Sequence, residues 1–376
     1  MHAPPGLPRP GVFISSRNSQ PSRQPTSQRK LDPMASRFIA SVLFLVATLG
    51  LLAAGDDRRA TVHVIEDIDA TRAFEPVEAT VRDLVQRGIQ ALAKTNDTRA
   101  AWRRFITPKD VVGFRLCTAP GPVTGTRPVV VRALVQSLLA AGHPPRQVVL
   151  WDKRASDIIL AGYSKLADEL GVRWAATEEI GWDPDHAYEN ATVGRLLIGD
   201  LEYARRDRAD AGKRSHVSKL LTRDVTKIVL VTPLLNHNHL GLNGQLANLS
   251  LGAVDNTLRF EQEAWRLAEA LPEICALDEL FGKLAFGVSD ALLCQYRGED
   301  RTLLHYAVAL NQLRFSTDPV ALDILGIQDI ERARATHPID GEKPIKTDLY
   351  FNAALQELGV ANTNLIDVAR IRPQRP

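Results

Sequence analysis

The sequence predicts an α/β protein that has a mostly parallel sheet, helices on both faces of the sheet and one irregular insertion. After residue 60, apolar runs of strand length alternate with longer stretches of helical period. This alternation favours parallel strands joined by helical crossovers, and such sheets are usually covered on both faces. No linker, repeat or low-complexity segment interrupts the chain after residue 60. We therefore expect a single domain at residues 56–376.

Each expected element has its own local signal. The strands are short apolar runs, and the helical stretches repeat apolar residues every three or four positions. Pro128 suits the first turn of a helix, and Gly142 and Gly171 suit the ends of two helices. Asp318 is expected to cap the last helix, because Pro319 fits its first position. In chain order we expect strands at 61–65, 111–116, 148–151, 172–175, 226–231, 284–288 and 307–315, and helices at 76–94, 128–142, 156–170, 258–271 and 319–330.

Residues 181–225 are the irregular insertion. They follow no sustained strand or helical period, and they contain the charged run Arg205-Arg206-Asp207-Arg208. A run of charges of this kind is typical of a solvated face. We therefore expect this segment to lie at the surface of the domain.

The charge of the chain is nearly balanced. Its 376 residues include 46 Lys and Arg against 44 Asp and Glu, for a formal net charge of +2. Residues 1–55 hold six of the bases and one of the acids, so the rest of the chain is mildly acidic, at −3. This balance excludes a generally polybasic nucleic-acid binder. The expected partner is a small-molecule ligand, with no nucleic acid.

The N-terminal segment resembles a leader followed by an export signal. Residues 1–33 hold seven of the 22 prolines and no apolar period, which predicts either disorder or a true start at Met34. Residues 34–55 combine a basic start, an apolar run and an Ala-Ala-Gly ending, the pattern of a signal peptide. An uncleaved anchor is the alternative, because the apolar run of 17 residues is at the lower limit for a spanning helix. We therefore expect an exported protein, periplasmic or extracellular, that meets a membrane only through an uncleaved signal.

Ligands of open parallel sheets bind beyond the carboxyl ends of the strands, so polar residues there are candidates for a site. Arg115 ends one expected strand and leads into a loop rich in Gly, Pro and Thr that includes Gly121 and Thr124. Such a loop before a helix can present main-chain N–H groups to an anion, and it also suits a rigid turn. Asp152 follows the next strand, where a carboxylate can bind a ligand, cap a helix or form an ion pair. We take all four residues as candidate ligand-binding residues.

His237 and His239 are the candidate acid/base residues. They lie in the polar segment Asn236-His237-Asn238-His239, after the expected strand at 226–231. In extended backbone, residues two apart share one face, so both imidazoles could ligate a metal. No third ligand stands at a recognised spacing, so a metal site is the minor alternative. A second alternative is a loop whose side chains form hydrogen bonds with its own backbone.

Asp290 and Asp318 end the two following strands, and Asp323 lies a little further along the chain. We expect these carboxylates to approach one another at the edge of the sheet. Asp290 and Asp318 would then orient or coordinate a ligand, as catalytic residues do. For Asp318, capping of the last helix is the favoured interpretation.

Several segments also occur in a recognisable order. They are Val112–Arg115, Gly121–Thr124, Val129–Gly142, Val149–Asp152, Pro233–His237, Gly241–Gly252, Val288–Ala291 and Phe315–Asp323. This order resembles the domain of unknown function 362 family over about residues 111–330. The resemblance implies an α/β fold and a ligand site around the matching loops, with Asn248 among the ligand-binding residues. It implies no assigned reaction.

The chain departs from this family at three positions. Relatives usually have Lys where this chain has Arg115, Asn236 and Ala247. Arg does not replace a titratable amine, and the charge is lost altogether at the other two positions, which weakens the case for anion binding there. Some members carry a ferredoxin module, whereas the three cysteines here are far apart and predict no iron–sulfur cluster. They leave open either one disulfide or three buried thiols. No other cofactor is indicated.

Two functional hypotheses remain. In the first, the chain is an exported enzyme or binding protein for a small polar or anionic ligand, with Arg115 and the loop 121–126 holding the anion and His237 or His239 as acid/base. In the second, it is a degenerate family member without turnover that acts as a binding or interaction protein, because the family's lysines are missing. The first is favoured, and whether the chain is an enzyme stays open.

Overall fold

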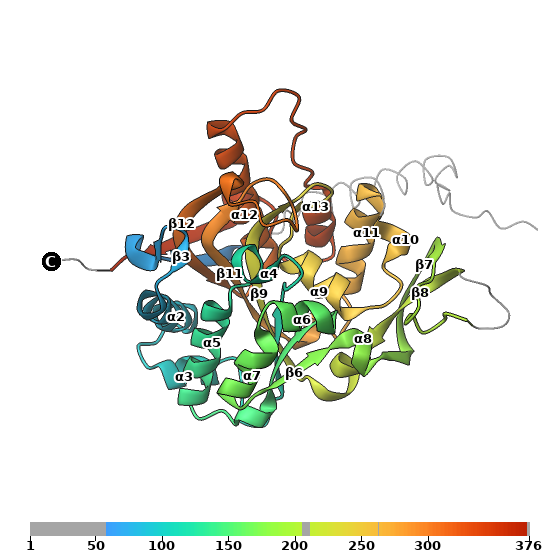
Figure 1. Cartoon of the computed structure of the whole chain (residues 1–376), viewed down its shortest axis with the longest axis horizontal. Helices are drawn as coiled ribbons and strands as arrows, with labels where there is room; N and C mark the ends of the chain where they lie inside the picture. Colours follow the sequence, from blue (N-terminus) through green and yellow to red (C-terminus); the bar gives the residue numbers. More distant parts are fainter. Residues whose placement is uncertain (1–57, 205–210, 262, 374–376) are drawn as a thin grey trace, which may run out of the picture. The chain divides into compact units, whose positions relative to one another are not determined.

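The computed structural model describes residues 58–204, 211–261 and 263–373, which form an α/β fold around a nine-stranded, mostly parallel sheet (Figure 1). The predicted fold class is therefore confirmed, with a separate antiparallel hairpin as its insertion. The leader, the signal peptide and the charged run at 205–208 lie outside the described residues. Within the described ranges, no helix is long and apolar enough to cross a membrane.

The strands form one large sheet and two hairpins. The large sheet contains β1 (Ala60–Glu66), β4 (Val112–Leu116), β5 (Val148–Asp152), β6 (Arg173–Ala176), β9 (Lys227–His237), β10 (Gly241–Leu242), β11 (Leu284–Gln295), β12 (Ala307–Ser316) and β13 (Ile366–Ile371). The hairpins are β2 (Thr71–Arg72) with β3 (Glu75–Pro76), and β7 (Trp182–Arg195) with β8 (Ala211–Ser218).

Helices connect most of these strands. The α-helices are α2 (Glu78–Ala93), α3 (Thr98–Arg103), α4 (Gly121–Thr124), α5 (Pro128–Ala140), α6 (Ala155–Leu160), α7 (Tyr163–Leu170), α8 (Thr177–Ile180), α9 (Gln245–Ala253), α10 (Leu258–Glu261), α11 (Ala264–Cys275), α12 (Pro319–Thr336) and α13 (Asp348–Leu355). Short 3-10 turns are η1 (Ile68–Ala70), η2 (Pro145–Gln147), η4 (Phe281–Lys283), η5 (Leu304–Tyr306) and η6 (Thr363–Leu365), and η3 (Leu220–Asp224) is a π-helix.

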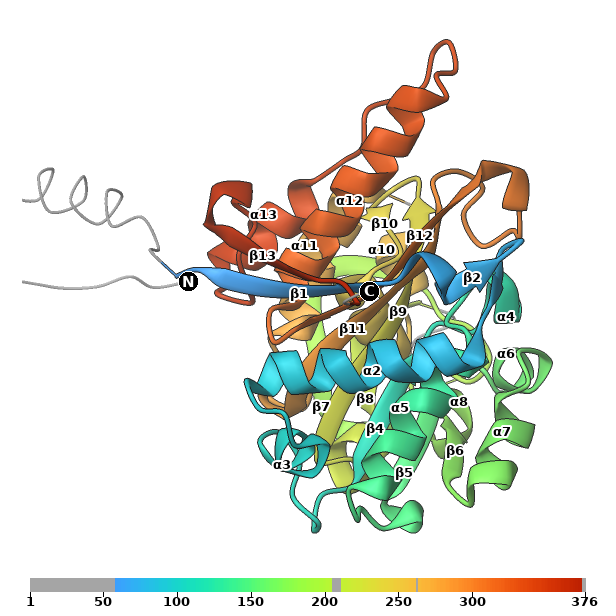
Figure 2. The same ribbon diagram turned by 90° about the vertical axis from the view of Figure 1, so that its left-hand side faces the viewer.

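The order of strands in the large sheet is β13-β1-β12-β11-β9-β4-β5-β6, with β10 paired to β9. Most neighbours run parallel, whereas β12 runs antiparallel to both β1 and β11, between which it lies (Figure 2). Ser316 at the end of β12 pairs with Gly287, near the start of β11. The carboxyl ends of β4, β5 and β9 therefore form one edge of the sheet, which we call the carboxyl edge, and β12 ends at the opposite edge.

Alternate side chains of β9, in the middle of the sheet, enter two separate hydrophobic cores. Ile228 and Leu230 of β9 pack in a core with α9, α11, α12 and α13, whereas Val229 and Val231 pack in a core with α2, α5 and α7. All four side chains are fully buried. This burial on both faces explains why the strand is apolar throughout. Burial of each such side chain contributes about 1.5–3 kcal/mol to the stability of the fold.

The insertion is more regular than the sequence indicated. Its strands β7 and β8 pair as an antiparallel hairpin in which Tyr188 lies opposite Ser215. The buried Arg259 of α10 holds both strands, because Nη1 donates to Asn190 Oδ1 at 2.5 Å and Nε donates to Ser215 Oγ at 2.9 Å. The hairpin therefore depends on a residue that follows it in the chain, which the local sequence pattern does not reveal.

Four other predicted elements differ in extent. The helix expected at 156–170 is divided into α6 and α7 at Gly162, whose φ of +83° suits glycine. The helix expected at 258–271 is divided into α10 and α11. Strands β9 and β11 continue to His237 and Gln295, well past the expected ends. The two strands pair with each other as far as Leu235, and the last two residues of β9 pair with β10.

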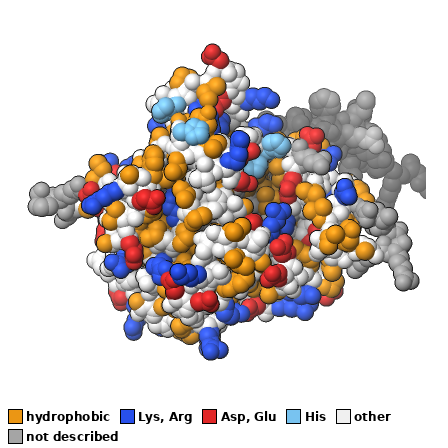
Figure 3. Space-filling model, in the orientation of Figure 1, with side chains coloured by type: hydrophobic (Ala, Val, Ile, Leu, Met, Phe, Trp, Pro, Cys, Tyr) orange, Lys and Arg blue, Asp and Glu red, His pale blue; other side chains and the backbone are white. Residues whose placement is uncertain are grey.

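Charged side chains of both signs are interspersed over the face of the molecule that Figure 3 shows. Several form exposed ion pairs, among them Arg132 with Glu169 at 2.6 Å and Arg173 with Asp224 at 2.8 Å. Pairs in such solvated positions contribute only about 0–1 kcal/mol to stability. They are a useful reference for the buried pairs at the carboxyl edge.

Asp323 joins α12 to the first turn of α9. Its Oδ1 accepts a hydrogen bond from Gln245 N at 2.7 Å, and its Oδ2 accepts one from Leu246 N at 3.2 Å. Burial raises the pKa of this carboxyl group to about 7, although the two N–H groups act in the opposite direction. The contact matters for the rest of the molecule because α9 carries Asn248 and Leu251 to the carboxyl edge.

Replacement of Asp323 by Asn is expected to remove a pH dependence of stability. Because the folded-state pKa lies above the ordinary value of 3.8, the stability contributed by this group is fully present below about pH 4 and is lost as the pH rises through 7. The free energy of unfolding of the wild type minus that of Asp323→Asn should therefore fall between about pH 5 and pH 8. Urea unfolding of both proteins at pH 5 and at pH 8 measures this difference in the free energy of unfolding. A difference that stays constant or rises would contradict the assignment.

Candidate functional site

A buried ion pair stands at the carboxyl edge, between the ends of β4 and β5. Arg115 Nη1 lies 2.6 Å from Asp152 Oδ1, and the two residues are 4% and 7% exposed. The other carboxylate oxygen of Asp152 accepts hydrogen bonds from Thr118 N at 2.8 Å and Thr118 Oγ1 at 2.6 Å. Arg115 Nε donates to the main-chain oxygen of Asn248 in α9, at 2.8 Å. The pair therefore links two strands, the following loop and a helix.

The guanidinium of Arg115 is enclosed on its remaining sides. Its central carbon lies 5.1 Å from the ring centroid of Trp151, and a Cβ added to Gly252 would approach the guanidinium to 2.4 Å. Gly252 is thus required by the close approach of α9 to Arg115. The expectation that Arg115 holds an anion with the loop 121–126 is not supported, because its charge is matched by Asp152 inside the protein.

The loop after β4 is held in a fixed shape. Gly121 and Thr124 begin and end the short helix α4, and Gly121 has a φ of +78°. Thr124 Oγ1 lies 3.3 Å from both Pro120 O and Thr302 Oγ1, and Thr126 Oγ1 donates to Val231 O at 2.6 Å. The hydroxyl groups of the loop are therefore engaged with the protein, as in the rigid-turn interpretation of this segment.

Asp290 forms a second buried ion pair, with Arg127 at the start of α5. Arg127 Nη1 lies 2.8 Å from Asp290 Oδ1, and the exposed fraction of Asp290 is zero. The pair joins the middle of β11 to the helix that crosses from β4 to β5. A carboxylate enclosed in this way supports the structure and has no access to a ligand from solvent.

Asp318 lies at the opposite edge of the sheet, where it caps α12 as predicted. Its Oδ1 accepts a hydrogen bond from Ala321 N at 2.8 Å, and its Oδ2 accepts one from Val360 N at 2.9 Å. The expectation that Asp290, Asp318 and Asp323 approach one another is wrong for Asp290, whereas Asp318 does lie near enough to Asp323 for its charge to raise the pKa of Asp323. Leu313 of β12 pairs with Asp290, and Asp318 lies five residues further on, about 16 Å along an extended chain. The antiparallel direction of β12 is the physical reason.

His237 and His239 lie at and beyond the end of β9. The ring centroids are 6.1 Å apart, and His237 Nδ1 accepts a hydrogen bond from His239 N at 3.1 Å. Burial lowers the pKa of His237, which the nearby Glu299 and Asp300 partly offset. No group of three or more His, Cys, Asp or Glu side chains that could hold a metal ion occurs in the described part of the chain.

The predicted site residues therefore form separate groups. Arg115, Asp152 and Asn248 meet in one network, Asp290 is paired with Arg127, and Asp318 lies at the opposite edge of the sheet. Asn248 Nδ2 also donates to Asn243 Oδ1 at 3.0 Å, and Asn243 donates to Asp300, whose carboxylate acts on the pKa of His237. All three cysteines are buried and none forms a disulfide. The described residues do not bring the predicted catalytic residues into one cleft.

A partly open polar cavity of about 180 Å³ lies directly beside the network, and Trp182 and the loop 197–200 of the insertion form part of its wall. Lys153, which follows Asp152 in the chain, enters it, and its Nζ donates a hydrogen bond to Thr257 Oγ1 at 3.0 Å. The remaining walls come from the insertion and from the segment around α9 and α10. The lining residues that carry charge are Lys153, Arg154, Glu178, Asp200 and Glu261.

The electrostatics of this cavity are unusual for a surface hollow. Lys153 is mostly buried, and burial lowers the pKa of its amine, while the carboxylates of Glu261 and Asp200 act in the opposite direction. Burial likewise raises the pKa of Glu178. Groups of this kind in a concave site mark a functional site more often than a random part of the surface.

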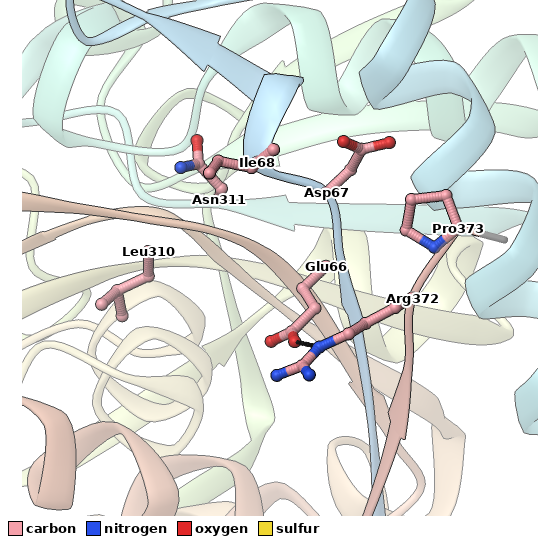
Figure 4. Close-up of a pocket in the computed structure, with 7 residues that line it drawn as sticks. All are labelled: Glu66, Asp67, Ile68, Leu310, Asn311, Arg372 and Pro373. Carbon is pink, nitrogen blue, oxygen red and sulfur yellow. Dashed lines mark hydrogen bonds and ion pairs between the residues drawn. The ribbon is translucent and has the colours of Figure 1, made fainter. Parts of the chain in front are cut away.

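Three further cavities lie away from the carboxyl ends of β4 and β5, and one of them is lined by His63 and Asp318, whose pKa values burial also shifts. The cavity of about 450 Å³ in Figure 4 lies at the end of β1, where Glu66 is paired with Arg372. A groove of about 460 Å³ lies over α2, α3 and α5, and another of about 360 Å³ lies at the edge opposite the carboxyl edge. The cavity beside Lys153 is the one that combines a position at the carboxyl edge with a mostly buried amine.

Sequence reasoning did not take Lys153 and Arg154, which directly follow Asp152, as site residues. Their position directly after a strand was a signal that could have been followed. Thr257, Asp200 and Glu261 gave no such signal, because they reach the cavity through the insertion and the segment around α10.

The fold and this cavity define an α/β protein with a small polar site at the carboxyl edge of its sheet. No family model matches the chain, and no curated protein sequence matches it. Among solved structures, a crystal structure of a structural-genomics target from Thermotoga maritima is distantly similar, with 12% identity and a TM-score of 0.36. The match covers 69% of this chain and 59% of that protein, so the chain spans less than two thirds of its length. We draw no argument from this likeness.

Replacement of Arg115 by Ala is expected to lower the free energy of unfolding by about 3–5 kcal/mol, because Asp152 would be left buried without its cation. Arg132→Ala is the matched control, since its pair with Glu169 is exposed, and it should cost about 1 kcal/mol or less. Chemical denaturation of both variants measures the difference. Equal, small losses would show that the buried pair does not organise the edge.

Proposed function

We propose that this chain is an exported α/β protein that binds a small polar or anionic molecule in the cavity beside Lys153. The observation that carries the proposal is the mostly buried amine of Lys153 in a polar cavity at the carboxyl end of β5. Ligands of open parallel sheets bind beyond this edge. The export part rests on the sequence of residues 34–55 alone.

The walls of the cavity indicate the kind of ligand. Lys153 and Arg154 offer positive charge to a carboxylate or phosphate group, while Asp200 and Glu261 can accept hydrogen bonds from hydroxyl or amino groups. A volume of about 180 Å³ is below the roughly 300–1,000 Å³ typical of sites for drug-sized ligands. The proposed ligand is therefore a molecule of a few carbon atoms with an anionic group.

A second hypothesis, a family member without turnover, is also supported by one observation. Arg115, Asp290 and Asp318 are each occupied by contacts within the protein, so the positions shared with the domain of unknown function 362 family are engaged in holding the fold. Membership of that family remains part of the proposal and rests on the order of the sequence segments. Both hypotheses include ligand binding and differ in whether a reaction follows.

Calorimetric titration with lactate and with inorganic phosphate tests the binding proposal. Lactate carries a carboxylate and a hydroxyl group and is small. Lys153→Gln should weaken binding of the anion by about 10- to 100-fold, the effect of losing a charged hydrogen bond of about 1.5–3 kcal/mol. Lys165→Gln, which changes an exposed lysine of α7, should bind as the wild type does. Binding that is equal in the wild type and Lys153→Gln, or absent for both anions, would refute the proposed site.

A further inference from the structure

The amine of Lys153 differs from the other buried lysine amine of the described chain in what surrounds it. Burial lowers the pKa of both Lys153 and Lys283. Lys283 Nζ is held by the main-chain oxygens of Leu221 and Val225, the latter at 2.9 Å. Lys153 Nζ instead donates to one hydroxyl group, Thr257 Oγ1, and no described carboxylate lies within ion-pair distance of it. It therefore retains hydrogen-bonding capacity that faces an open volume.

A lysine in this setting is suited to covalent chemistry as well as to charge recognition. An ammonium group without a paired anion, taken out of water, loses its proton more readily, and the neutral amine is the nucleophilic form. Lysines that form imines with carbonyl compounds are activated by such desolvation. The same cavity is lined by Glu178, Asp200 and Glu261, which can exchange protons with bound reactants.

We propose that Lys153 forms a reversible imine with a small carbonyl compound that carries an anionic group. This inference rests on the proposed function and names the substrate class of that site. The neutral Nζ attacks the carbonyl carbon, and one of its two protons passes to the carbonyl oxygen to give a carbinolamine. A cavity carboxyl group then donates a proton to the hydroxyl group, which leaves as water, and the resulting carboxylate takes back the remaining N–H proton to complete the imine. Amine and carbonyl compound thus give imine and water, with no oxidant or reductant.

The lining of the cavity favours an anionic carbonyl compound over a neutral one. Arg154 lies next to Lys153 in the wall and retains a positive charge when Lys153 becomes a neutral imine. A 2-oxo acid of a few carbon atoms would place its carboxylate toward Arg154 and its carbonyl carbon toward Lys153. Thr257, which already contacts Nζ, would remain beside the new carbon–nitrogen bond.

Reductive trapping tests this inference directly. The full chain is incubated with pyruvate and sodium cyanoborohydride near neutral pH, and the modified lysines are located by peptide mass spectrometry. Because desolvation and the cavity favour one amine, labelling of Lys153 should exceed that of exposed Lys165 by at least about tenfold. Lys153→Arg should lose the adduct, whereas Lys283→Arg should be labelled as the wild type is, since Lys283 contacts main-chain oxygens outside the cavity.

Lactate separates the failure of this inference from the failure of the proposed function. It matches pyruvate except that a hydroxyl group replaces the carbonyl group, so it should compete with labelling without forming an adduct. If lactate and pyruvate bind at Lys153 and no adduct is trapped there, the imine is overturned and the binding site stands. If neither binds, both proposals fail. Labelling spread evenly over the lysines also overturns the imine.

Discussion

The ion pair between Arg115 and Asp152 is the interaction on which the carboxyl edge of the sheet depends. It joins β4 to β5, fixes Thr118 in the following loop and draws α9 against the sheet through the main chain of Asn248. A buried pair of this kind contributes little net stability compared with apolar packing. Removal of one partner is nevertheless strongly destabilising, because the other charge is left buried and unpaired. We infer that its main effect is to fix which groups stand at the edge. Lys153 stands beside it because it is the next residue after Asp152.

The charged residues at the carboxyl edge fall into two groups: those that are paired within the protein and those that remain accessible to a ligand. Arg115, Asp152, Arg127 and Asp290 are nearly or fully buried and paired with one another. Lys153, Arg154 and Asp200 instead line the partly open cavity beside the Arg115–Asp152 pair, together with Trp182 and the loop that follows β7. The β7–β8 hairpin is itself held by the buried Arg259. The insertion therefore supplies one wall of the cavity at the end of β5.

Local sequence signals were sufficient for most of the fold. Apolar runs located the strands of the parallel part, and Asp318 with Pro319 marked the start of α12 correctly. The direction of β12 was not predictable in this way, because an apolar run has the same pattern whichever way the strand points. Because the direction of β12 was unknown, Asp318 was wrongly predicted to lie near Asp290. The hairpin was missed because Arg259, which holds it, is distant in sequence.

The candidate site was predictable only in part for a related reason. Strand ends correctly brought Arg115 and Asp152 to one edge, yet whether a charge meets a ligand or a partner depends on burial, which residue type alone does not specify. The cavity depends on the end of β5, α8, the insertion, α9 and the segment around α10, which meet only in the folded chain.

A crystal structure of the chain soaked with lactate tests the central claim most directly. The account predicts a carboxylate in the cavity beside Lys153, with an oxygen about 2.7–2.9 Å from Lys153 Nζ, while the Arg115–Asp152 pair stays in place. Lactate bound elsewhere, or a cavity closed by side chains at saturating lactate, would contradict it.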